Sequence, residues 1–120
     1  MIYEMLAHIK KRPEMYMSRP SITSLSYYVH GFELALSFHD VFSTEDEREF
    51  QQFKQWMARE WSGANLGWWG QILLLVSCHE QLESESDAAL EEKAFAEFFV
   101  LLEHYSLLFQ QAEAHVNLLF

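Results

Sequence analysis

The stretch that decides the fold class is ITSLSYYVHGFELAL, residues 22–36. Its large apolar residues recur at steps of three or four positions: Ile22, Leu25, Val29, Phe32 and Leu36. This spacing places them on one face of an α-helix, and Ser21 directly before it suits the N-cap. Only four glycines and two prolines occur in all 120 residues. We therefore expect helices on both sides of this stretch as well.

The segment before it has the same helical spacing and then a turn. Its apolar residues are Ile2, Met5, Leu6 and Ile9. Pro13 disfavours the α conformation at Arg12, so we expect the first helix to end near Lys11. The chain from Pro13 to Pro20 is then a turn.

The segment after it predicts two more helices. Thr44 and Glu47 form a plausible capping box, and the apolar residues that continue this helix are Phe50, Phe53, Met57 and Trp61. SGANLG at 62–67 is a loop. Residues 68–82, WWGQILLLVSCHEQL, could hold a buried strand at 72–77, but three consecutive leucines are not a β-branched run, so we favour a helix.

The last predicted helix begins near Asp87. Its core face consists of Phe95, Phe98, Phe99, Leu102, Tyr105 and Phe109. Residues 111–120 either extend it or pack separately. The sequence therefore predicts an all-α, single-domain bundle of about five helices over residues 1–120, antiparallel in the simplest arrangement.

Signatures of catalysis and metal binding fail on spacing. HEQLE at 79–83 resembles a zinc-protease motif, but its last position is Glu83 and not a second histidine. No glutamate has a histidine three residues on, as a di-iron bundle requires. Cys78 and His79 point about 100° apart on a helix, so they are no preformed pair. We expect no enzyme, no metal and no cofactor, and we place Cys78 in the core.

The net charge bounds the choice of partner. The chain carries −10 at pH 7, with a pI near 4.9. Such a surface repels nucleic acid and attracts a basic protein. The longest apolar run, Ile72–Val76, is too short to span a membrane, and the N-terminal residues are not a secretory signal. We expect a cytoplasmic protein.

The charges are unevenly distributed. Residues 1–19 hold four basic and two acidic residues, so the rest of the chain carries −12. One acidic concentration is Asp40, Glu45, Asp46, Glu47 and Glu49; the other is Glu80, Glu83, Glu85, Asp87, Glu91 and Glu92, with Glu97 further on. They are either solvated loops and helix N-termini, which favour anions, or a docking face for a basic protein.

Two further side chains have open roles. Trp68, with Trp61 and Trp69 beside the same loop, either packs in the core or anchors a partner, because Trp is enriched in interface hot spots. Glu33 falls at the edge of the apolar stripe of residues 22–36. Either Glu33 reaches solvent at the flank of the helix, or it is half-buried and needs a partner, for which the candidates are Lys11, Arg12 and His30.

The segment KKRPEMYMSRPSI, residues 10–22, resembles a string that precedes the ATP-binding helix in the ATPase subunits of bacterial type II topoisomerases. The likeness covers about ten residues. Glu14 stands where that family has Gly, and the following helix lacks the residues that would hold magnesium and adenine. We interpret the segment as a local helix–turn–helix device, with Met15, Tyr16 and Met17 packed under the turn.

The pattern KRPxMYxxxxSIxxLxxYxxGFxxA at residues 11–35, in a small acidic helical chain, resembles the immunity proteins (CdiI type) of bacterial contact-dependent growth inhibition. The resemblance implies that the chain binds one cognate basic toxin domain, such as an RNase, and blocks it. The alternative is a non-catalytic helical adaptor or regulatory protein that forms a homodimer. Its contact residues would be Val100, Leu101, Leu107, Leu108, Leu118, Leu119 and Phe120.

Overall fold

The computed structural model describes residues 2–38, 45–60, 67–79 and 87–119, with side chains for 2–38, 45–59, 67–77 and 87–111. These residues form five α-helices and one 3-10 turn, and none of them is in a strand. The elements are α1 (Ile2–Lys11), η1 (Pro13–Met15), α2 (Ile22–Phe38), α3 (Glu45–Glu60), α4 (Gly67–His79) and α5 (Asp87–Leu119). The all-α prediction is confirmed, and so is the choice of a helix over a strand at 72–77.

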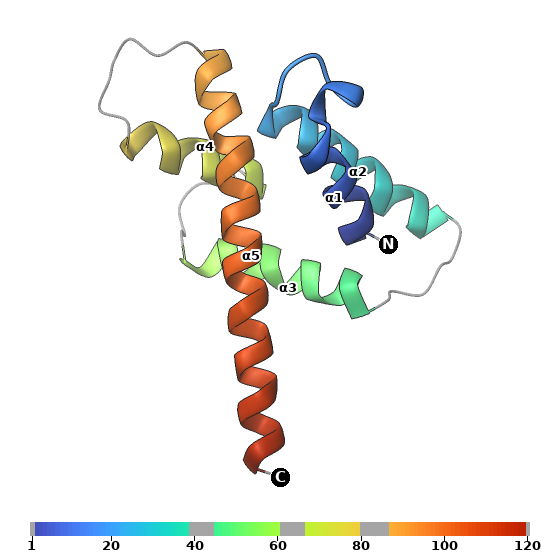
Figure 1. Ribbon diagram of the computed structural model, residues 1–120, viewed down its shortest axis with the longest axis vertical. Helices are drawn as coiled ribbons and strands as arrows, with labels where there is room; N and C mark the ends of the chain where they lie inside the picture. The colour runs from blue at the N-terminus through green and yellow to red at the C-terminus, as the bar shows by residue number, and fades with distance from the viewer. Residues whose placement is uncertain (1, 39–44, 61–66, 80–86, 120) are drawn as a thin grey trace.

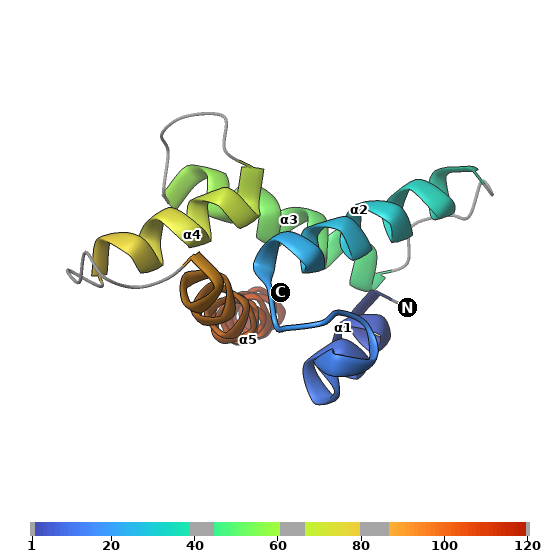
Figure 2. The ribbon, with the colours of Figure 1, turned by 90° about the horizontal axis from the view of Figure 1, so that it is seen from above.

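Helix α5 sets the length of the molecule. At 1.5 Å per residue its 33 residues span about 50 Å, close to the longest extent of 53 Å. The other helices are too short to run beside it for its full length. Figure 1 shows α3 and α4 lying across α5, so the simple antiparallel arrangement is wrong. Seen from above, α2 and α4 lie on one side, and α1 and α5 lie on the other (Figure 2).

The core is aromatic and centres on α5. The ring of Phe98 has no exposed surface and lies 6.5 Å from Phe50 and 5.9 Å from Phe53, centroid to centroid, in edge-to-face contact. The apolar residues expected on helix faces that are buried are Ile2, Leu6, Ile9, Ile22, Leu25, Val29, Phe50, Phe53, Met57, Phe95, Phe98, Phe99 and Tyr105, whereas Phe32, Leu36, Leu102 and Phe109 are half-buried. Edge-to-face pairs add stability beyond the burial of area, so this cluster fixes how α3 lies against α5.

The turn after α1 follows the prediction except at one residue. Helix α1 ends at Lys11, and the amides of Tyr16 and Met17 donate to the Pro13 carbonyl at 2.9 Å. Tyr16 and Met17 pack against the core, but Met15 is 67% exposed, so its expected packing is wrong. A 3-10 turn spaces successive side chains about 120° apart, so not all three can face inward.

The local sequence features at the helix starts are Ser21 before α2, Thr44 before α3 and Gly67 at the start of α4. The Ser21 hydroxyl accepts from the Ser24 amide at 3.2 Å, as an N-cap does. Thr44 lies outside the described residues, and so does the capping box predicted for it. Gly67 opens α4 at φ 70°, where a Cβ would come within 2.8 Å of the Trp69 ring. A side chain at position 67 would strain both the backbone and that contact.

Two expectations from the sequence concern the end of α5 and the partner of Glu33. Helix α5 continues to Leu119, so the residues after 110 extend it. Glu33 accepts from Lys54 Nζ at 2.8 Å and from Gln51 Nε2 at 2.8 Å, both on α3. None of the three candidates named for Glu33 is its partner, because tertiary packing brings α3 beside it. Among the described helices, none combines the length and apolarity that crossing a membrane requires.

Candidate partner-binding surface

The start of α5 presents two exposed carboxylates, Asp87 and Glu92. Glu92 Oε2 lies 3.7 Å from Arg19 Nη2, and both side chains are more than half exposed. An exposed pair at that distance contributes little to stability. Glu80, Glu83 and Glu85 lie outside the described residues.

Glu91 is placed differently from its two neighbours. Its carboxylate accepts from the Thr23 amide at 2.9 Å, from the Thr23 hydroxyl at 2.6 Å and from the Ser21 hydroxyl at 2.9 Å. Burial alone raises the pKa of Glu91, but these hydrogen bonds outweigh it and hold the pKa below its ordinary value. Glu91 thus caps the N-terminus of α2 from another helix, and we leave it out of the docking face.

The acidic first turn of α3 is also partly internal. Glu45 is exposed and Asp46 is half-buried, whereas Glu47 is only 6% exposed and accepts from the Ile2 amide at 3.3 Å. Glu47 thus links α3 to the start of α1. Asp40 lies outside the described residues. Of the described acidic residues in this turn, Glu45 is the one that a partner reaches most readily.

The two acidic segments do not meet. In Figure 1 α5 begins at the top of the molecule and α3 begins low on the right, and the view from above separates the two helix starts as well. A partner that covers Asp87 and Glu92 would therefore approach a different part of the protein from one that covers Glu45.

Trp68 packs in the core. Its ring is half-buried, with its centroid 5.0 Å from that of Phe98 and 6.4 Å from that of Phe50. Trp69 is also half-buried and meets Trp68 edge-on at 5.7 Å. These contacts favour the core-packing role for Trp68 over the anchoring role. Trp61 lies outside the described residues.

The sequence did not point to an exposed aromatic face on α2. Tyr27, Leu34 and Phe38 are all exposed, and they fall on one side of the helix at intervals of seven and four residues. The opposite side carries the buried stripe of Ile22, Leu25 and Val29. Helix α2 is thus apolar on both sides, and its outer face is a second surface that a partner could cover.

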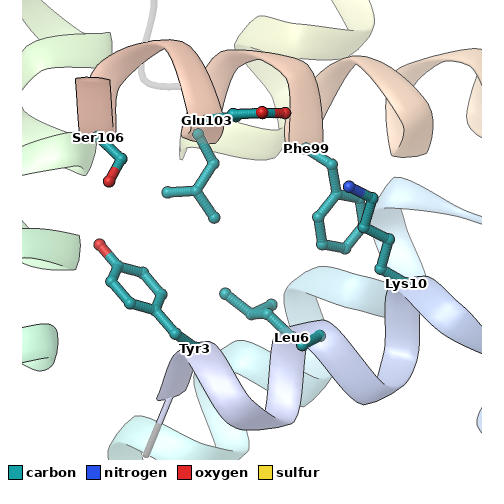
Figure 3. Close-up of a pocket in the computed structure, with 8 residues that line it drawn as sticks. Tyr3, Leu6, Lys10, Phe99, Glu103 and Ser106 are labelled. Carbon is teal, nitrogen blue, oxygen red and sulfur yellow. The ribbon is translucent and has the colours of Figure 1, made fainter. Parts of the chain in front are cut away.

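The sequence also gave no sign of a groove between α1 and α5, which we call the α1–α5 groove. Its volume is about 330 Å³, and it is lined by Tyr3, Leu6, Ala7, Lys10, Phe99, Leu102, Glu103 and Ser106. Figure 3 shows Tyr3 and Leu6 on α1 facing Phe99 and Ser106 on α5, with the Glu103 side chain lying along α5. The hydroxyls of Tyr3 and Ser106 lie at one end, and Lys10 and Phe99 lie at the other.

The two ends of the groove differ in charge. Lys10 Nζ lies 5.6 Å from the centroid of the Phe99 ring, within cation–π range. At the opposite end the Tyr3 hydroxyl and Glu49 Oε1 are buried, and the Tyr3 hydroxyl interacts with the Glu49 carboxylate. Burial, then the charge of Glu49 and the hydrogen bond to it, and then the charge of Asp46 raise the pKa of Tyr3 above its ordinary value of 10. Tyr3 is therefore uncharged at neutral pH.

The spacing of the lining residues in the sequence does not reveal the groove. Tyr3 and Lys10 are seven residues apart and so share a side of α1, and Phe99, Glu103 and Ser106 share a side of α5. Such spacing indicates which residues share a face. It does not indicate that two faces leave a space between them.

In the part of the chain that the structure describes, no three His, Cys, Asp or Glu side chains gather to hold a metal ion. The side chains of Cys78 and His79 are not among those described. The chain matches no protein-family model, no curated protein and no solved structure in the comparisons made.

Proposed function

We propose that this protein binds a basic toxin domain, an RNase, and neutralises it as an immunity protein. The observation that carries the proposal is the excess of ten negative charges. Several described carboxylates lie on exposed residues: Glu4, Glu14, Glu45, Asp87, Glu92 and Glu103. The pattern at residues 11–35, which resembles immunity proteins, supports the same reading.

The proposed mechanism is electrostatic. A nuclease that binds RNA has a cationic groove for phosphates, and carboxylates of an inhibitor can occupy the positions of those phosphates. Asp87 and Glu92 at the start of α5 suit this role, because both are exposed on one rigid helix. Opposite charges also steer the two proteins together, which raises the association rate constant most at low salt.

The test uses the C-terminal domain of the protein whose gene lies immediately upstream of the gene for this chain. Production of that domain alone should arrest growth, and production together with this chain should restore it. The two purified proteins should form a complex on size exclusion. If no complex forms, or if a basic domain binds without loss of its nuclease activity, the proposal fails.

A double variant locates the surface. Asp87→Lys with Glu92→Lys should lower the association rate constant at least tenfold at low salt and flatten its salt dependence. Glu14→Lys with Glu4→Lys makes the same change in net charge elsewhere and serves as the matched control. Equal effects of the two double variants would show that only net charge matters and not the start of α5.

The alternative function, a homodimeric adaptor, has one observation in its favour. Val100, Leu107 and Leu108 on α5 are 58%, 54% and 42% exposed. Leu101 is buried within the protein, so it is not available for a dimer contact. The side chains of Leu118, Leu119 and Phe120 lie outside those described. Sedimentation velocity at micromolar concentration decides: a single monomeric species removes this alternative.

A further inference from the structure

We propose that the α1–α5 groove receives one arginine side chain of the basic partner, with its guanidinium group at the Tyr3–Ser106 end. This inference rests on the proposed function, because it names an anchor for the same class of partner. It assigns a second contact region, on the side of α5 that faces α1.

The shape of the groove suits a long side chain with an apolar stem. Leu6 and Ala7 form the α1 wall, and Leu102 forms the α5 wall. Tyr3 and Lys10 are seven residues apart, which is about 10 Å along the helix. The methylene groups of an arginine would lie against Leu6 and Leu102 while its charged end reaches the hydroxyls.

The charges near the groove favour a cation over an anion. Glu103 lines the groove, and Glu49 acts on Tyr3 from α3, whereas Lys10 is the one basic residue in the lining. Asp46 acts on Tyr3 as well, so the negative charges here outnumber the positive charge of Lys10, on a protein whose net charge is already −10. Lys10 also lies at the far end, about 10 Å of helix from Tyr3, which is about one Debye length in 0.1 M salt.

The hydrogen-bonding groups at the Tyr3–Ser106 end favour a ligand group that donates hydrogen bonds and accepts none. The Tyr3 hydroxyl is buried and has one proton, which its contact with Glu49 uses, so its oxygen remains an acceptor. Ser106 adds a further hydroxyl at the same end (Figure 3). A guanidinium has five N–H donors and no acceptor, so it can donate to several oxygens at once. Arginine is also among the residues most enriched at the energetic centres of interfaces.

The direct test titrates the protein with N-acetyl-L-arginine amide and follows the ¹H–¹³C signals of the Leu6, Ala7 and Leu102 methyl groups. We expect saturable shifts with a dissociation constant in the millimolar range. The citrulline counterpart has nearly the same shape without the charge, and it should bind at least tenfold more weakly. Equal shifts with both compounds, or shifts confined to residues outside the groove, would overturn the proposal.

Variants assign the contacts. Tyr3→Phe and Ser106→Ala should each weaken arginine binding several-fold, and Glu49→Gln should weaken it through loss of the charge. Glu4→Gln removes an exposed carboxylate from α1 outside the groove lining and is the control. Should Glu49→Gln unfold the chain, the first two variants still decide. The lysine counterpart should bind more weakly than arginine, and equal binding would contradict the assignment to a guanidinium.

The experiment separates this inference from the proposed function. Arginine binding is measured without any toxin domain, so its absence leaves the growth rescue standing. In the complex, Ala7→Phe fills the groove from an exposed position and should raise the dissociation rate constant at least tenfold. If Ala7→Phe forms the complex with an unchanged dissociation rate constant, the proposed function stands and the groove is not the arginine site.

Discussion

Phe98 and Phe99 are neighbours in the chain, but they face different surroundings on α5. Phe98 has no exposed surface and meets Phe50, Phe53 and Trp68. Phe99, about 100° further round the helix, borders the α1–α5 groove, where Lys10 lies over its ring. The side of α5 toward α3 and α4 is filled with aromatic rings, whereas the side toward α1 retains an open space. Stability is concentrated on the first side, and we place binding on the second.

Two carboxylates show the same contrast. Glu91 accepts three hydrogen bonds from Ser21 and Thr23 and so holds α2 against α5. Glu49 is half-buried beside Tyr3, and its charge raises the pKa of both Tyr3 and Tyr105. A carboxylate whose hydrogen bonds are all made within the chain stabilises the fold. One that lies beside a groove gives that end of the groove a negative charge, which attracts a cation.

The largest expected effect is on the filled side of α5. Phe98→Ala should lower the free energy of unfolding by about 3–5 kcal/mol, because it leaves a cavity among rings that cannot close around it. Leu102→Ala removes a side chain that borders an existing space, so it should cost less than half as much. Urea unfolding followed by circular dichroism measures both. Equal losses would mean that the two sides of α5 do not differ in packing.

The next effect concerns the cap from α5 onto α2. Glu91→Gln replaces one acceptor oxygen by an NH₂ group that faces the donors of Ser21 and Thr23. We expect a loss of about 1.5–3 kcal/mol in the free energy of unfolding. Glu92→Gln, one residue on and exposed, should change it by less than about 0.5 kcal/mol. If the two variants lose the same amount, Glu91 is not a cap.

The pH dependence of stability tests Glu91 by its charge. Because the folded state lowers its pKa, the contribution of Glu91 is fully present above the unfolded pKa, near 4.5. It is lost as pH falls through the lower pKa of the folded state. Urea titrations from pH 6 to pH 3 should therefore show a steeper loss of stability for the wild type than for Glu91→Gln. Parallel curves would contradict the lowered pKa.

The sequence predicted the helices well, because periodic apolar residues and Pro13 act locally. It also predicted that Ser21 caps α2. It did not predict that Glu91, seventy residues away from Ser21, completes that cap, or that Glu33 pairs with Lys54. Nor did it predict the groove, because a space depends on how two faces meet. Long-range pairing of polar groups has no periodic signal, whereas burial of an apolar face does.

The smallest effect distinguishes two ion pairs among the described residues, one between two helices and one between a turn and a helix. Lys54 and Glu33 lie 2.8 Å apart with side chains about one quarter exposed, whereas Arg19 and Glu92 lie 3.7 Å apart and are more than half exposed. A double-mutant cycle should give a coupling of about 0.5–1 kcal/mol for the first pair and close to zero for the second. Addition of 1 M salt should reduce the first coupling only in part, since partly buried pairs are screened less. A larger coupling for Arg19 and Glu92 would mean that Glu92 is held within the fold, as Glu91 is, and it would remove Glu92 from the proposed docking surface.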